Sequence, residues 1–306
     1  MSSEGFPLLV LQPMLGPAQE WTGVRVRGAG LADAEDLQRL FGEFALAQAI
    51  PGLVCLLPAS AIALLDVAAL PAALAAGLVP LPDSGEAAQI PLPQLHGKGP
   101  TQVMLLKILA QITGDAETRD IEATLKQDPQ LSVQLLRLVN SAAFAPAARI
   151  SSFAHAITML GRRQLQRWLQ LLLYAGQSAG AGGNPLLTVA ALRASLMEGL
   201  CKANRGDKAI QDEAFMVGMF SLLDRLFGKP LADIVGPLNL VRDVNDALLT
   251  RSGKLGELLD LVEKAETGPD AIVSELRRAG IGNEAWCRAQ IEALRWTLQI
   301  SRDSQA

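Results

Sequence analysis

Helical periodicity through the last two thirds of the chain is the feature that most constrains the fold. After residue 97, apolar side chains recur every three or four residues in one segment after another, and the segments are separated by Gly, Asn, Asp or Pro. Helices of this kind become stable when their apolar faces pack together, so the pattern predicts an all-α bundle at residues 98–306. The expected helices are 103–112, 120–126, one that begins at Asp128 and Pro129, one that ends at Gly161, 162–174, 187–202, 212–227, 231–235, 240–249, 255–266, 270–279 and 284–300.

Residues 1–97 differ from the rest in composition. They hold 10 of the 17 prolines, with 3 basic and 9 acidic residues and thus a net charge of −6, whereas residues 98–306 hold 24 basic and 22 acidic residues and a net charge of +2. Short β-branched and apolar runs predict strands at 7–13, 21–28, 52–58 and 77–82, and helices are expected after Asp33 and Ala59. We therefore predict a small mixed α/β domain at residues 1–97, with a boundary in the Pro- and Gly-rich stretch 80–100.

Composition excludes several classes of protein. Half of the 306 residues are hydrophobic and 19% are charged, which excludes a disordered chain. Neither a disulfide framework nor a zinc knuckle is expected, because the three cysteines are far apart. The net charge of −4 argues against wholesale nucleic-acid binding. No membrane span is expected, because Asp66 and Pro71 interrupt the most apolar stretch, and without a signal-peptide pattern we expect a cytoplasmic protein.

Two adjoining segments carry a family resemblance. Residues 126–144 (KQDPQLSVQLLRLVNSAAF) combine D-P before an amphipathic helix with N-S at its end, and residues 149–173 contain an I-S-S turn followed by A-I-x-x-L-G. Together they resemble the HDOD domain, a bacterial signalling module related in fold to HD-type metal phosphohydrolases. The resemblance covers about residues 98–300 and implies a mainly α, HD-like helical bundle.

The resemblance also indicates where metal ligands would lie. In catalytic relatives, the helix that corresponds to 213–228 carries a His-Asp pair, and the helix that corresponds to 192–200 carries another histidine. Here those positions hold Ser221, Leu222 and Ala194, and neither Ala nor Leu can bind a metal. With only two histidines in the chain, we expect no catalytic residue, no metal, no cofactor and no enzymatic activity.

The N-terminal segment resembles a shortened EAL domain, the family of cyclic di-GMP phosphodiesterases. Residues 11–14 (LQPM) are similar to its first strand, and residues 52–65 are similar to one of its strand-to-helix passages. The acidic residues that bind metal in that family have no counterpart here. The expected architecture is thus of the EAL-HDOD type, with a degenerate EAL-like segment.

A run of arginines suggests a docking surface. No Asp or Glu occurs from residue 129 to residue 197, so an acidic partner protein could bind there, although acidic residues of later helices could equally pair with these arginines. The arginines concerned are Arg137, Arg149, Arg162, Arg163, Arg167 and Arg193.

Three functions remain open on this basis. The main hypothesis is a non-catalytic signal-transduction module that acts through contacts with an unknown signalling protein. The first alternative is a divergent phosphoester or cyclic-nucleotide hydrolase whose metal ligands are carboxylates, with Asp212, Glu213 and Asp224 as candidates. The second is a sensor that binds cyclic di-GMP through the arginines without cleaving it. Neither the partner nor the oligomeric state follows from the sequence.

Overall fold

The N-terminal unit is a four-stranded mixed sheet in this computed structural model, which describes residues 5–16, 21–28, 31, 33–65, 77–81, 100–125, 127, 153–175, 185–238 and 240–303. The strands are β1 (Val10–Leu15), β2 (Trp21–Arg27), β3 (Val54–Pro58) and β4 (Leu78–Leu81), and they lie in the order β1-β2-β3-β4. β1 runs antiparallel to β2, whereas β2, β3 and β4 are parallel. The predicted mixed α/β unit is therefore confirmed.

Short helices connect the parallel strands of this sheet. Asp33 caps α1 (Ala34–Gln38) by accepting a hydrogen bond from the Glu35 amide, and the chain continues through a π-helical turn at Arg39–Glu43 into α2 (Leu46–Ala49). α3 (Ala59–Ile62) follows β3. A parallel pair of strands needs such a crossover, and this is why the sequence inserts helices between β2 and β3 and after β3.

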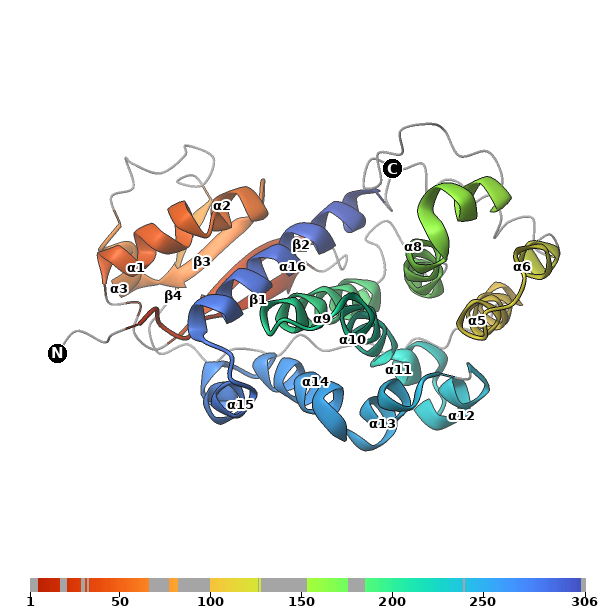
Figure 1. Cartoon of the computed structure of the whole chain (residues 1–306). Coiled ribbons are helices and arrows are strands. Elements are labelled where there is room, and N and C mark those ends of the chain that lie inside the picture. The colour runs from red at the N-terminus through yellow and green to blue at the C-terminus, as the bar shows by residue number, and fades with distance from the viewer. Residues whose placement is uncertain are drawn as a thin grey trace.

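The helical part follows the predicted order of segments and confirms a mainly α chain. The long helices α9 and α10 pack along each other, with α16 beside α9 (Figure 1). The elements are α5 (Pro100–Thr113), α6 (Thr118–Leu125), α8 (Phe153–Ala175), α9 (Pro185–Ala203), α10 (Lys208–Phe220), α11 (Leu223–Phe227), α12 (Leu231–Val235), η3 (Gly236–Leu238), α13 (Arg242–Thr250), α14 (Gly253–Ala265), η4 (Pro269–Ile272), α15 (Val273–Ala279) and α16 (Asn283–Asp303).

Two helix boundaries differ from the predicted ones. The single helix predicted at 212–227 is divided in two at Ser221 and Leu222, because Leu222 leaves the helical conformation between α10 and α11. One helix was predicted to end at Gly161 and the next to begin after it. Gly161 has a non-helical φ of 77°, and it forms a kink within α8. The helix expected after Asp128 and the domain boundary at residues 97–98 lie outside the described residues, and both stay predictions.

The C-terminal helix α16 is shared by the sheet and the bundle. One side of it packs into the sheet's core through Cys287, Ile291 and Leu294, while Trp286 and Ala293 belong to the bundle's core. Figure 1 shows α16 lying along β1 and α9. The N-terminal unit therefore completes its apolar core with a helix from the far end of the chain.

Polar side chains of α16 also bind the backbone of the first strand. The Trp286 indole N–H donates to the Leu9 carbonyl at 2.8 Å. The Gln290 amide donates to the same carbonyl at 3.0 Å, and its Oε1 accepts from the Leu11 N–H at 2.8 Å. These bonds satisfy buried backbone groups of Leu9, which directly precedes β1, and of Leu11 on β1, the edge strand of the described sheet.

Within the described part of the chain, no helix combines the length and the apolar character that crossing a bilayer requires.

We expect Gln290→Leu to lower the free energy of unfolding by about 2 kcal/mol, because it leaves the buried Leu11 N–H without an acceptor. Chemical denaturation measures this difference. Gln299→Leu is the matched control, since Gln299 is an exposed residue of the same helix and its replacement should change stability by less than about 0.5 kcal/mol. Equal stability of the two variants would contradict the role assigned to Gln290.

Candidate functional site: the centre of the helical bundle

The three positions predicted to correspond to HD metal ligands lie where α9 and α10 pack together. Ala194 lies in the middle of α9 and is completely buried. Ser221 and Leu222 lie at the junction of α10 and α11, with exposed fractions of 5% and 4%. The fold therefore buries all three positions inside the bundle.

A glycine sets the distance between the two helices at this crossing. A Cβ atom at Gly218 would lie 2.4 Å from the Ala194 Cα and 2.5 Å from the Ala194 nitrogen. The backbones of α9 and α10 are thus in direct contact, and only residues with little or no side chain fit between them. Ala194 itself is completely buried, so an imidazole at position 194 would require the surrounding core to rearrange.

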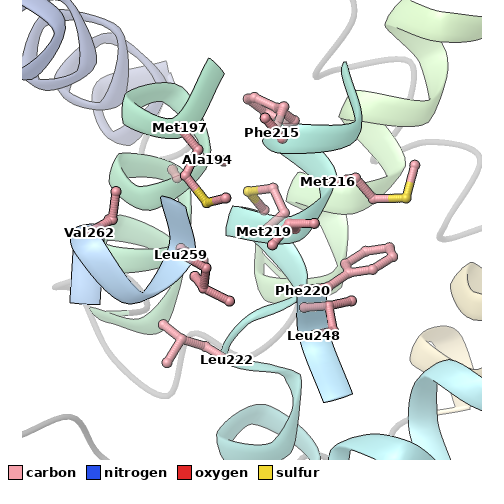
Figure 2. Close-up of a cluster of buried hydrophobic side chains, with 14 of the residues drawn as sticks. Ala194, Met197, Phe215, Met216, Met219, Phe220, Leu222, Leu248, Leu259 and Val262 are labelled. Atoms are coloured by element: carbon pink, nitrogen blue, oxygen red, sulfur yellow. The ribbon is translucent and has the colours of Figure 1, made fainter. Parts of the chain in front are cut away.

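Large apolar side chains fill the space around the crossing. Figure 2 shows Met197 of α9 and Met219 of α10 close to Ala194, with Leu259 of α14 beside them. The cluster also contains Phe215, Met216 and Phe220 of α10, Leu222, Leu248 of α13 and Val262 of α14, all buried. This region is a packed hydrophobic core, and its side chains supply thioether sulfur but no imidazole or carboxylate.

Beside this core, the buried Arg193 forms an ionic cluster with two partly exposed glutamates. Its guanidinium donates to Glu266 at 2.6 and 2.8 Å, to Glu263 at 2.7 Å and to the Ser221 hydroxyl at 3.1 Å. The Ser221 hydroxyl in turn donates to the Gly218 carbonyl at 2.8 Å. Ser221, at the position of an HD ligand, is therefore fully occupied by protein partners.

The surroundings of Arg193 keep it charged although it is only 6% exposed. Burial disfavours the cation, but the charges of Glu266 and Glu263 outweigh this effect and raise the pKa of Arg193 above its ordinary value. Burial also raises the pKa of the neighbouring Tyr174, whose hydroxyl donates to the Met219 carbonyl at 2.5 Å. Arg193 therefore stays positively charged inside this part of the bundle.

The residues described at this site do not fit a metal ion. Ala194 and Leu222 offer no donor, Ser221 is held by Arg193 and Gly218, and the nearby carboxylates are engaged by the guanidinium. In the described part of the chain, no three His, Cys, Asp or Glu residues cluster as a metal site requires. We therefore derive no metal-dependent step at the bundle centre.

The carboxylates considered as alternative metal ligands are not assembled into one site. Asp212 accepts from Arg167 at 2.8 Å and also pairs with Arg163. Glu213, the next residue, lines a separate cavity between α10 and α13. Asp224 lies in the first turn of α11.

The described arginines of the suggested docking surface all have carboxylate partners. Arg162 pairs with Asp115 at 2.5 Å, Arg163 with Asp212, and Arg167 with Glu198 at 2.6 Å and with Asp212. Arg193 is buried, so it does not lie on a surface. Arg137 and Arg149 lie outside the described residues, and a docking role for the set stays a prediction.

Comparison with known families confirms the resemblance to the HDOD domain over part of the chain. The HDOD domain model matches residues 100–227, which run from α5 to the end of α11. The described structure is also similar to an HDOD domain protein from Geobacter sulfurreducens, with a TM-score of 0.35, 14% identity, and coverage of 67% of this chain and 94% of that one. None of these matches shows that the N-terminal unit is an EAL domain.

Two curated proteins are similar in sequence. The cyclic di-GMP phosphodiesterase CdgJ of Vibrio cholerae is 33% identical over 183 residues, which are 60% of this chain and 42% of CdgJ. The protein YuxH of Bacillus subtilis is 30% identical over 175 residues, which are 56% of this chain and 42% of YuxH. The chain thus matches less than half of the length of either relative.

The expectation that this protein is not an enzyme is contradicted by the similarity to CdgJ, which is named as a phosphodiesterase. The expectation of no enzymatic activity was wrong because it considered only Ala194, Ser221 and Leu222, which lie at one place in the fold. The side chains at these three positions carry no information about chemistry in other parts of the protein.

We expect Gly218→Ala to lower the free energy of unfolding by about 2 kcal/mol, because the added methyl group forces the backbones of α9 and α10 apart. Gly236→Ala is the control, since a Cβ there meets no atom within 4 Å and should change stability by less than about 0.5 kcal/mol. Denaturant titration of both variants measures the difference, and a neutral Gly218→Ala would show that the helices do not touch.

Proposed function

We propose that this chain acts in cyclic di-GMP turnover and hydrolyses cyclic di-GMP to the linear dinucleotide. The observation that supports this proposal is the 33% identity with a protein named a cyclic di-GMP phosphodiesterase. The similarity extends over 183 residues, which is longer than the HDOD segment at residues 100–227. The relationship therefore includes more of the chain than the signalling domain alone.

In the proposed reaction, a water molecule attacks one phosphorus atom of the cyclic dinucleotide. The P–O bond to one ribose oxygen breaks, that oxygen takes a proton, and the product is a linear dinucleotide with one terminal phosphate. We assign no part of this step to Ala194, Ser221 or Leu222, because the site around them is packed and holds no free donor. The HDOD bundle would contribute a rigid body next to the place of cleavage.

A second role for the bundle is transmission of a signal through protein contacts, which the packed centre favours. Apolar contacts among α9, α10, α13 and α14 hold the interior of the bundle together. The outer faces of the helices are therefore available for a partner protein. Among the described arginines of the suggested docking surface, Arg163 has the most exposed side chain, at 51%. An acidic partner protein would have to compete there with Asp212.

The hydrolysis proposal predicts that the purified full chain converts cyclic di-GMP to linear dinucleotide when Mg²⁺ or Mn²⁺ is supplied. Anion-exchange chromatography of the nucleotides measures the product, which should increase in proportion to protein concentration. A mock purification from a host without the gene controls for contaminating phosphodiesterases. Product at the level of the mock preparation would contradict the proposal.

Ser221→Ala is the matched variant in this assay. Since Ser221 is bound to Arg193 and to Gly218, we expect the variant to hydrolyse cyclic di-GMP within about twofold of the unchanged chain. A loss of more than about tenfold in a variant with unchanged thermal unfolding would instead place the reaction at the bundle centre.

A further inference from the structure

A cavity of about 540 Å³ lies away from the bundle centre, between the C-terminal end of α9, the N-terminal half of α10, α13 and the start of α14. Figure 1 shows these helices converging on one side of the bundle. Its volume is in the range of ligand-binding pockets. Leu255, Leu258 and Ile281 are buried residues of its lining, and Ile210 adds an apolar side chain that is 43% exposed.

The charged groups that line the cavity are mostly acidic. Glu213, Asp243, Asp246 and Glu257 contribute four carboxylates, against the two cations of Lys254 and Arg278. Both cations belong to exposed residues, as do Asp243 and Glu257, so solvent screens these four charges, whereas the two partly buried charges, Glu213 and Asp246, are both negative. The cavity is therefore unsuited to an anion such as a cyclic dinucleotide and suited to a cation.

Three of these carboxylates, those of Glu213, Asp243 and Glu257, have no cationic partner in the described part of the chain. Asp246 pairs with Arg242 at 3.4 Å, but no described Lys or Arg lies within ion-pair distance of the other three. Partial burial raises the pKa of Glu213, and the negative charges of Asp243, Asp207 and Asp212 raise it further. Ionised Glu213 is thus held in an environment that an added positive charge would stabilise.

We propose that this cavity binds an arginine side chain of a partner protein. The guanidinium would donate to Glu213 and Asp243, and the apolar stem would contact Leu255, Leu258 and Ile281. Exposed Ile210 at the same cavity offers a contact for an apolar residue next to the arginine. An arginine side chain uses both the acidic and the apolar lining, whereas a bare metal ion would leave the apolar lining without contacts.

The test uses the peptide acetyl-Leu-Arg-Leu-amide as the probe and the full chain as the receptor. Its control peptide carries citrulline in place of arginine, which has nearly the same shape and no charge. In isothermal titration calorimetry, we expect the arginine peptide to bind at least about tenfold more tightly than the citrulline peptide. Equal affinities, or no heat from either peptide at millimolar concentration, would overturn the proposal.

Variants that each remove one negative charge test whether the arginine peptide binds in the cavity. Glu213→Gln and Asp243→Asn should each weaken binding of the arginine peptide by about tenfold. Glu292→Gln removes one charge from an exposed residue of α16 that does not line the cavity, so it should keep the affinity within about twofold. Equal weakening by all three variants would show a general effect of charge and would contradict a site at the cavity.

Thermal unfolding of Glu213→Gln keeps this test interpretable. A carboxyl whose pKa is raised in the folded state lowers the free energy of unfolding as the pH rises from its unfolded-state pKa to its folded-state pKa, and this loss persists at higher pH. At pH 7 the variant should therefore unfold at the same temperature as the unchanged chain or at a higher one. Lost peptide binding in such a folded variant then reports on the cavity, and unchanged binding would contradict the role of Glu213.

Discussion

The contact between Gly218 and Ala194 is the constraint on which the rest of the bundle depends. Because α9 and α10 touch along their backbones there, the apolar side chains on either side of the crossing meet without a gap. Ala194 is also completely buried, so a larger side chain at this position would require the surrounding apolar core to rearrange. The centre is thus a site of packing, and any chemistry or partner binding must use other surfaces of the protein.

The C-terminal helix α16 packs against both the bundle and the N-terminal sheet. α16 lies along α9 on one side, and on the other it binds β1 through Trp286 and Gln290. A second connection runs through Glu266, whose carboxylate binds Arg193 and whose carbonyl accepts from the Gln12 side chain at 2.6 Å. The bundle and the sheet are therefore joined by buried polar contacts and by α16, which contributes side chains to both apolar cores.

Periodicity and turn residues in the sequence were sufficient to predict the four strands and most of the helices. The separation of α10 from α11 was not predictable from periodicity, since apolar residues continue through Leu222 and Leu223. The partners of Arg193 were also missed, because Glu263 and Glu266 are some 70 residues away along the chain. One available signal was overlooked, namely Gly218 in the middle of a helical run, which is typical of close helix packing.

The packed centre is tested most directly by anomalous diffraction from crystals of the full chain grown with Mn²⁺. The account predicts no manganese peak between α9, α10 and α14, because Arg193 engages the carboxylates of Glu263 and Glu266 there. A manganese ion within bonding distance of the Ser221 hydroxyl or of the Glu263 carboxylate would contradict it.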